Sequence, residues 1–175
     1  MLAGYACLDA QVAAGYDILA LGQLKHVLEL NTLVLCGTSE PRRAAHAAHL
    51  AATEQRFYDE RAAGIEDVVE WHAAHAGEEP WGRAAGVYVR ILSAPQLFIE
   101  GNHRTGVLVM SHLLVREGLP PFVLSVRNAA AYFEPTTELR DIPKNGVTGL
   151  LRLPGIQARL AALLREHADP RYLLG

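Results

Sequence analysis

The sequence predicts a mainly α-helical protein that forms one domain over residues 1–175. Apolar residues recur at helical spacing in one segment after another, and glycines and prolines separate these segments. One segment, 107–115, is apolar on nearly every side, as expected for a helix in the centre of a domain. The length is close to that of a single domain, and no linker or repeat divides the chain. There is room for a small β-hairpin, whose position the sequence does not indicate.

The first half of the chain is predicted to contain three helices. Leucines at helical spacing predict one helix between residues 16 and 35. Ser39 is a suitable N-cap for the second helix, with Pro41 in its first turn and Gly64 beyond its end. The third helix is expected from 65 to 76, because its apolar residues share one face.

The second half is predicted to contain three longer helices and one extended piece. Pro80 is expected to begin a helix that Pro95 ends. The apolar stripe of this helix consists of Trp81, Ala84, Ala85, Tyr88, Ile91 and Leu92. The buried helix of residues 107–115 follows, and then a short extended segment over 122–126. Pro154 is expected to begin the last helix.

Composition excludes several classes of function. The net charge is −3 and acidic and basic residues are interspersed, so we expect no nucleic-acid partner. The most apolar early stretch, 18–35, is interrupted by polar side chains, so we expect no membrane partner. Cys7 and Cys36 are too few for a disulfide framework, and the N-terminus lacks the basic region of a signal peptide. These features predict a cytoplasmic protein.

The residues expected to carry chemistry lie in segment 96–105, which leads into the buried helix. A helix N-terminus has backbone amides without intrahelical partners and a partial positive charge, so it attracts anions. Gly101 permits a tight turn, and Asn102 tolerates unusual dihedral angles and supplies a side-chain amide. Arg104 is unfavourable in the first turn of an isolated helix, but a phosphate between it and the free amides explains its presence.

An acidic residue completes this predicted site. Glu100 would repel a phosphate unless a divalent cation lay between them, and Mg²⁺ is commonly held by one or two carboxylates plus phosphate oxygens. The segment therefore predicts a site for a Mg²⁺-bound nucleotide, with Phe98 anchoring the loop in the core. Residue types alone leave another interpretation open. In that interpretation Asn102 is a plain N-cap, Glu100 interacts with the helix dipole and Arg104 pairs with a surface acid.

The same segment resembles the signature of the Fic family, H-x-F-x-[D/E]-G-N-G-R-x-x-R. The residues on matching positions are Phe98, Glu100, Gly101, Asn102 and Arg104. The resemblance implies a mainly helical fold in which the signature loop precedes a buried helix. It also implies an AMP transferase-like enzyme that uses ATP, or another nucleotide, and Mg²⁺. The partner implied is a target protein with a Ser, Thr or Tyr hydroxyl that accepts the transferred group.

Residue by residue, the resemblance implies that Glu100 holds Mg²⁺ and that Arg104 contacts the phosphates beyond the transferred one. The residues expected to bind the nucleotide are Gly101, Asn102, His103, Arg104 and Thr105. Gln96, together with Asn102 and Arg104, is expected to form the catalytic set.

Three positions depart from the family pattern. The family's histidine, which takes the proton from the attacking hydroxyl, is replaced by Gln96, whose neutral amide can only hydrogen-bond. Val107 replaces the second arginine, and His103 lies where glycine is common, with its side chain expected to point away from Gln96. Loss of a general base typically costs about 10²–10⁴ in rate, so slow or altered transfer is expected. A non-catalytic module that binds a nucleotide or anion for regulation or interaction remains the alternative.

We expect the other histidines and tryptophans considered to have structural roles rather than chemical ones. Two His-x-x-His pairs, His46 with His49 and His72 with His75, are expected to be solvated or half-buried helix residues rather than metal ligands. His112 is expected to lie in the core, bonded to a backbone carbonyl. Trp71 and Trp81 are expected to pack in the core or at a contact between two copies of the chain, which leaves a homo-oligomer open.

Overall fold

The computed structural model describes residues 1–173, and these residues form a mainly helical protein, as the sequence predicts. The α-helices are α1 (Leu2–Ala13), α2 (Lys25–Cys36), α3 (Glu40–Ala45), α4 (Ala47–Phe57), α5 (Ile65–Ala74), α6 (Pro80–Leu92), α7 (Asn102–Arg116), α8 (Ala129–Thr136) and α9 (Val147–Glu166). Three short 3₁₀ helices are η1 (Glu60–Ala62), η2 (Leu139–Asp141) and η3 (Pro170–Tyr172). Within residues 1–173 no β-hairpin forms, and the β-type pairing is limited to one isolated bridge between Ala94 and Pro143.

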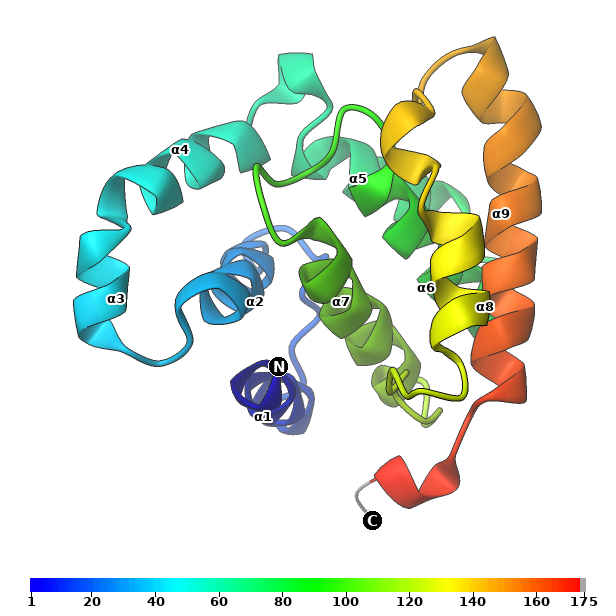
Figure 1. Ribbon diagram of the computed structural model, residues 1–175, viewed down its shortest axis with the longest axis horizontal. Helices are drawn as coiled ribbons and strands as arrows, with labels where there is room; N and C mark the ends of the chain where they lie inside the picture. The colour runs from blue at the N-terminus through cyan, green and yellow to red at the C-terminus, as the bar shows by residue number, and fades with distance from the viewer. Residues whose placement is uncertain (174–175) are drawn as a thin grey trace.

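Helix α7 lies in the centre of the fold, with other helices packed around it (Figure 1). It contacts α6 on one side and α1 and α2 on the other, while α6 also packs against α5 and α9. The prediction of a central helix over residues 107–115 is therefore confirmed, and the helix starts earlier, at Asn102. Because α7 contacts helices on both sides, the loop before Asn102 is held in a defined position at one end of the core.

The close packing of α6 on α7 depends on a small residue. The predicted stripe of α6 is buried from Ala84 to Leu92, and Tyr88 is fully inaccessible. A Cβ atom on Gly106 of α7 would lie 2.9 Å from Cδ2 of Tyr88, closer than side chains tolerate. Gly106 therefore lets the Tyr88 ring pack directly against the backbone of α7.

The first half of the chain differs from the prediction in three ways. The helix expected over residues 16–35 begins only at Lys25, because Gly22 adopts a left-handed conformation with φ of 82°. The second predicted helix is divided into α3 and α4 at His46, where φ is −105°. Helix α1 was not predicted, because its buried face consists of Gly4, Leu8 and Gln11, which form no apolar stripe.

The second half differs at two places. Residues 122–126 form no strand, because the backbone of Phe122 bonds to side chains: its N–H donates to Ser111 Oγ and its carbonyl accepts from Tyr5 Oη. Pro154 lies inside α9 instead of at its start, since the helix already begins at Val147. A proline ring therefore interrupts the hydrogen-bond ladder of α9 at an exposed position.

The histidine of the central helix also differs from expectation. His112 is fully inaccessible, and neither of its ring nitrogens has a hydrogen-bond partner among residues 1–173, so the expected bond to a backbone carbonyl does not form. Burial lowers the pKa of His112 to about 4, assisted by the nearby Arg116. The imidazole is therefore neutral at physiological pH.

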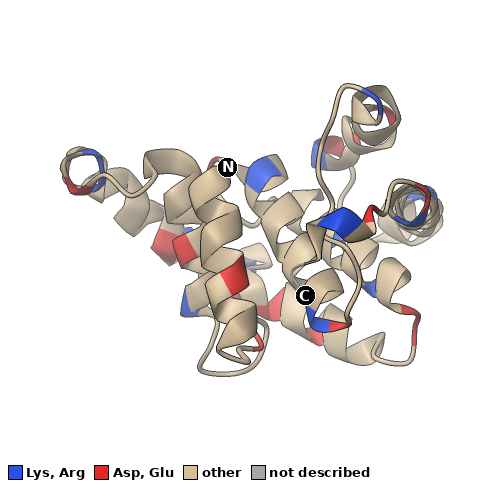
Figure 2. Cartoon of the chain, turned by 90° about the horizontal axis from the view of Figure 1, so that it is seen from below, with Lys and Arg blue, Asp and Glu red and all other residues tan. Residues whose placement is uncertain are grey.

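The surface of the molecule carries mixed charge. In the view of Figure 2, acidic and basic residues are scattered over the molecule, with long uncoloured stretches of helix between them. Cys7 and Cys36 are free thiols. Across residues 1–173, no helix combines the length and the apolar character needed to cross a membrane.

Candidate functional site

The loop between α6 and α7 turns at Gly101, which is the N-cap of α7. The φ angle of Gly101 is 79°, a left-handed conformation that glycine adopts without strain. A Cβ atom at this position would lie 3.1 Å from Asn31 Nδ2 and 3.2 Å from Val34 Cγ1, both on α2. The turn predicted at Gly101 therefore forms, and it packs tightly against α2.

Asn102 holds this loop through its side chain. Its Oδ1 accepts a hydrogen bond from the Phe98 N–H at 2.9 Å, and its Nδ2 donates to the Phe98 carbonyl at 2.8 Å. Phe98 is buried, as predicted, and stacks on Phe57 with ring centroids 5.7 Å apart. The side-chain amide of Asn102 was expected to bind phosphate, but it is buried and bonded within the loop. Its contribution to an anion site is therefore limited to its backbone N–H.

Asn31 on α2 supports the loop from the other side, a role that no pattern in the sequence indicates. Its Nδ2 donates to the Glu100 carbonyl at 2.9 Å and to Thr105 Oγ1 at 3.0 Å. Thr105 was predicted to bind the nucleotide, but it is fully buried against α2 and its N–H donates to the Gly101 carbonyl. Thr105 is therefore a structural residue, because the first turn of α7 directs its side chain into the core.

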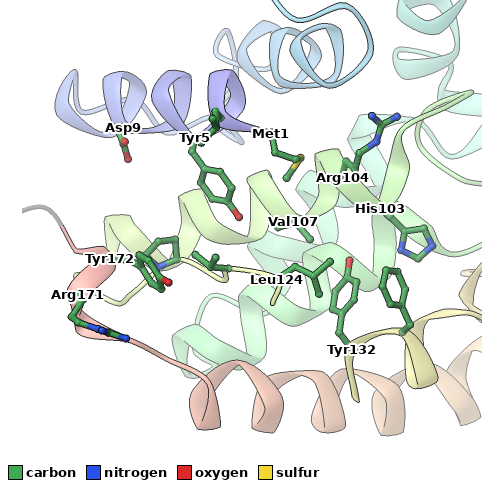
Figure 3. Close-up of a pocket in the computed structure, with 14 residues that line it drawn as sticks. Met1, Tyr5, Asp9, His103, Arg104, Val107, Leu124, Tyr132, Arg171 and Tyr172 are labelled. Carbon is green, nitrogen blue, oxygen red and sulfur yellow. The ribbon is translucent and has the colours of Figure 1, made fainter. Parts of the chain in front are cut away.

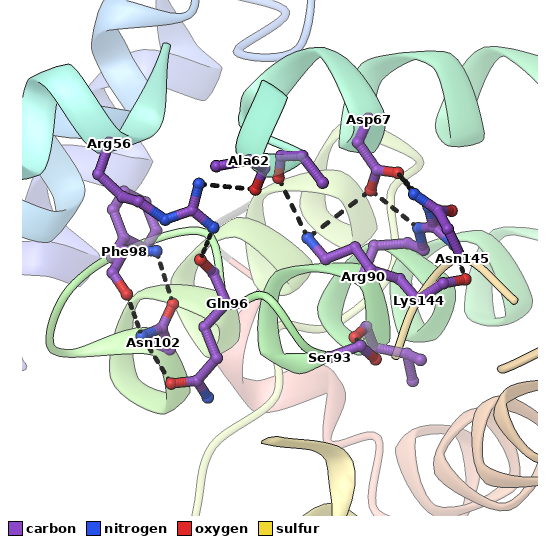
Figure 4. Close-up of polar contacts among 12 residues, drawn as sticks. Arg56, Ala62, Asp67, Arg90, Ser93, Gln96, Phe98, Asn102, Lys144 and Asn145 are labelled. Carbon is purple, nitrogen blue, oxygen red and sulfur yellow. Dashed lines mark hydrogen bonds and ion pairs between the residues drawn. The ribbon is translucent and has the colours of Figure 1, made fainter. Parts of the chain in front are cut away.

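Arg56 of α4 connects the start of the loop to η1. Its guanidinium donates to the carbonyls of Ala62 and Gln96, as Figure 4 shows. The Gln96 side chain lies beside Asn102, with its Nε2 donating to the Leu92 carbonyl at 3.2 Å and its Oε1 accepting from Asn102 Nδ2 at 3.4 Å. The Gln96 side chain is thus held beside the start of α7.

The buried Lys144 contacts residues next to those bound by Arg56. Lys144 Nζ lies 3.4 Å from the Ala63 carbonyl and 3.7 Å from the Asp67 carboxylate (Figure 4). Burial lowers the pKa of Lys144 to about 8, partly offset by Asp67. Arg90 of α6 also pairs with Asp67 and donates to the Lys144 carbonyl at 3.1 Å. These contacts fix residues 94–97, because Lys144 N–H donates to the Ala94 carbonyl at 2.8 Å.

The first turn of α7 has no side-chain cap. Gly101 offers no side chain, and the backbone amides of Asn102, His103 and Arg104 make no hydrogen bond to another group among residues 1–173. Such amides carry the partial positive charge of the helix dipole. The first turn of α7 therefore has the free amides on which the predicted anion site depends.

Arg104 and Glu100 are the charged residues next to these amides. Arg104 is exposed, donates from Nη1 to the Val34 carbonyl at 3.1 Å, and has no ion-pair partner within residues 1–173. The Glu100 side chain is 64% exposed, with Oε2 4.0 Å from His49 Nε2. Among the described residues no three His, Cys, Asp or Glu side chains gather in a metal-binding group. Glu100 would therefore hold Mg²⁺ only together with ligand oxygens.

A cavity of about 730 Å³ opens beside the first turns of α7 (Figure 3). Its walls come from α1, α7, α8, η3 and the segment between α7 and α8, and most of them are apolar. The cavity residues already noted in the sequence are His103, Arg104 and Val107, whereas Gln96, Glu100 and Asn102 are not among its lining residues. Tyr132 and Phe133 of α8 form an aromatic wall next to His103, with the Phe133 ring centroid 6.3 Å from the imidazole.

His103 faces this cavity and the core, not Gln96. Its Nδ1 lies 2.9 Å from Tyr88 Oη, and burial lowers its pKa, assisted by the positive charge of Arg140. The expectation that His103 does not replace the missing base agrees with this orientation.

Comparison of the chain with models of protein families, with characterised proteins and with solved structures finds no match to any of them.

Proposed function

We propose that this protein binds a Mg²⁺-nucleotide at the N-terminus of α7. The phosphates would lie against the amides of Asn102, His103 and Arg104, with the Arg104 guanidinium beside them. The observation that carries this proposal is that the uncapped first turn of α7 adjoins a ligand-sized cavity to which His103 and Arg104 also belong. Ligand sites commonly have volumes of about 300–1,000 Å³, and free helix amides are an established phosphate-binding feature.

The residues present suit both parts of such a ligand. Glu100 supplies one exposed carboxylate, which together with phosphate oxygens satisfies the usual requirement of Mg²⁺. Once bound, the cation neutralises phosphate charge. The apolar cavity with its aromatic wall of Tyr132 and Phe133 suits the flat, uncharged part of a nucleotide. Arg104 has no competing carboxylate among residues 1–173, so its charge is available to the phosphates.

The reaction proposed for this site is transfer of AMP to a hydroxyl of a protein, as in the Fic family that the loop resembles. A bond forms between the acceptor oxygen and the α-phosphorus, the bond to the leaving diphosphate breaks, and the hydroxyl proton passes to solvent or phosphate. Gln96 would hydrogen-bond the acceptor without taking its proton. Because phosphoryl-type transfer rests largely on positioning and charge stabilisation, the step would be slow rather than abolished.

A second candidate is a module that binds the nucleotide without catalysis. The observation that favours it is the engagement of Gln96, whose amide bonds both to the Leu92 carbonyl and to Asn102 Nδ2. A glutamine amide is not a base, and these two hydrogen bonds hold it against the loop. The two candidates share the binding site and differ only in whether a product forms.

Calorimetric titration with ATP and Mg²⁺ tests binding. We expect saturable binding that EDTA weakens, and a fall in affinity of about 10-fold or more in Arg104→Ala, because a charged hydrogen bond contributes about 1.5–3 kcal/mol. Arg159→Ala is the matched control, since Arg159 is also exposed but lies on α9, away from the cavity. Absence of binding by the wild-type protein to any common nucleotide at millimolar concentration contradicts the proposal.

Incubation with ATP labelled at the α-phosphate separates the two candidates. Label on the protein itself or on lysate proteins, lost in Arg104→Ala, indicates catalysis. Binding without label indicates the non-catalytic module. In that case Gln96→His is expected to create transfer if the rest of the site is competent, because it places a base at the start of the loop.

A further inference from the structure

Three side chains from three helices form a hydrogen-bonded chain that ends at the cavity. Tyr132 Oη of α8 and Tyr88 Oη of α6 lie 2.5 Å apart, and Tyr88 Oη lies 2.9 Å from Nδ1 of His103. Both tyrosines are buried, with Tyr132 only 1% exposed, while His103 is half-buried at the wall of the cavity. Neither hydroxyl makes another hydrogen bond of good geometry within residues 1–173, and the nearby Thr136 hydroxyl donates its own hydrogen to the Tyr132 carbonyl at 2.9 Å. These hydrogen bonds therefore run through the buried contact between α6, α7 and α8 beside the cavity.

The donors and acceptors in this series of hydrogen bonds can be assigned by counting the hydroxyl and imidazole hydrogens. If Tyr132 donates to Tyr88 and Tyr88 donates to His103 Nδ1, both buried hydroxyl hydrogens have acceptors. In the opposite direction, His103 would donate from Nδ1 and the Tyr132 hydrogen would have no acceptor among the described residues. A buried donor left unpaired costs about 1–3 kcal/mol, so the first direction is favoured.

We infer that the Tyr132–Tyr88 pair holds His103 as a neutral imidazole with its hydrogen on Nε2, so that the ring donates a hydrogen bond to a ligand acceptor in the cavity. Nδ1 is turned towards Tyr88 in the core, so Nε2 lies on the opposite side of the ring, which borders the cavity. His103 then selects ligands that place an oxygen or nitrogen acceptor there. Tyr88 is a positioning residue, because it acts only through the imidazole.

The surroundings of His103 agree with this state. Burial and the positive charge of Arg140 lower the pKa of the imidazole, which keeps the ring neutral. Packing against the rings of Tyr132 and Phe133 limits its rotation. A neutral ring with Nδ1 already accepting a hydrogen bond has no free lone pair, so His103 acts as a donor and not as a base.

This inference rests on the proposed function for the identity of the ligand, but the tautomer of His103 is tested without any ligand. Long-range ¹H–¹⁵N spectra of the ¹⁵N-labelled protein distinguish protonated from unprotonated ring nitrogens. The chain contains eight histidines, and His103→Gln identifies the signal of interest. We expect an unprotonated Nδ1 and a protonated Nε2 for His103. A protonated Nδ1 in the wild-type protein overturns the inference.

Two conservative variants test the role of the tyrosines. Tyr88→Phe removes the donor to Nδ1, so the His103 signals should move towards a mixture of tautomers. Tyr132→Phe removes the far end of the chain and leaves the bond between Tyr88 and His103, so the Nε2–H form should persist. Unchanged tautomer signals in Tyr88→Phe contradict its positioning role. If Tyr88→Phe does not fold, the wild-type and Tyr132→Phe spectra still decide the direction of the chain.

Titration with Mg²⁺-ATP then tests donation to the ligand. His103→Leu removes the donor and should weaken affinity about 10-fold, while His103→Gln keeps an N–H donor and should stay within about 3-fold of wild type. Equal affinity of the Leu variant and the wild type overturns the donor role. Failure of the wild type to bind any nucleotide instead removes the proposed function, and the tautomer spectra then decide the remaining inference.

Discussion

The side-chain amide of Asn31 joins two parts of the chain at the candidate site. It lies on α2, is 1% exposed, and donates both to the Glu100 carbonyl and to Thr105 Oγ1. Through these bonds it orients the peptide before Gly101 and thus the uncapped first turn of α7. A buried amide of this kind stabilises one loop conformation, because leaving either acceptor unpaired is costly.

Replacing this amide should affect stability and the site together. Asn31→Leu is expected to lower the free energy of unfolding by about 1–3 kcal/mol, because the Glu100 carbonyl and the Thr105 hydroxyl lose their donor. Thr105→Val is the matched variant, which removes one acceptor and keeps the bond to Glu100, so its effect should be smaller. Urea denaturation followed by circular dichroism measures both. An Asn31→Leu protein as stable as wild type contradicts this role.

At the scale of one element, α9 contains two glycines, Gly149 and Gly155, whose surroundings differ. Gly149 lies under the loop before the helix, where a Cβ atom would be 2.2 Å from the Pro143 carbonyl oxygen. Gly155 lies in the middle of the helix, and a Cβ atom there would meet nothing within 4 Å. Alanine is preferred over glycine in a helix, so the packing around each site decides the sign of the effect.

Alanine substitutions in α9 should therefore have opposite effects. Gly155→Ala is expected to raise the free energy of unfolding by about 0.5–1 kcal/mol, because alanine loses less backbone freedom on folding. Gly149→Ala is expected to lower it, because the new methyl group forces the 143–144 backbone to move. Thermal or urea unfolding of the pair gives the comparison. Stabilisation by both substitutions would contradict the close approach of Pro143.

At the scale of the whole molecule, the central helix carries an imidazole in a core that offers it no hydrogen bond. His112 is surrounded at longer range by Asp17, Arg116 and His26, but burial dominates its pKa. The folded protein therefore disfavours the imidazolium form, whereas the unfolded chain accepts the proton near pH 6.5. This difference couples the stability of the fold to pH.

The sign of this coupling is definite. Between pH 6.5 and about 4 the unfolded state binds a proton that the folded state does not, so the free energy of unfolding falls as pH falls. The loss from His112 amounts to roughly 3 kcal/mol over that range. Urea midpoints measured at several pH values should show it. His112→Leu should flatten the slope, and an unchanged slope in this variant would show that other groups cause it.

The sequence predicts a helix well where the pattern of apolar residues reflects which faces of that helix are buried. Helix α6 shows its buried stripe, and α7 is apolar on most sides, because each residue's burial is set by its place on a central helix. Helix α1 was missed because Gly4 and Gln11 lie on its buried face. Gly4 packs against Leu108, and only that distant contact explains why a residue with no side chain is buried.

The candidate site divides in the same way. The turn at Gly101, the anchoring of Phe98 and the free amides of the first turn of α7 depend on neighbours in sequence, so a single short segment predicts them. The roles assigned to Asn102 and Thr105 changed, because their side chains turn into the loop and towards α2. The packing of the whole of α7 decides which side chains of its first turn are exposed to solvent.

By itself, the sequence determined that the chain is helical, that the segment of residues 107–115 is central, and that a turn at Gly101 precedes this central helix. Only the tertiary structure decided which residues hold that loop and what lies beside it. Asn31, Arg56 and Tyr132 act on it from helices far away in the chain. Local patterns report backbone preference and burial, whereas hydrogen bonds between helices depend on how those helices pack, and no spacing along one segment encodes that arrangement.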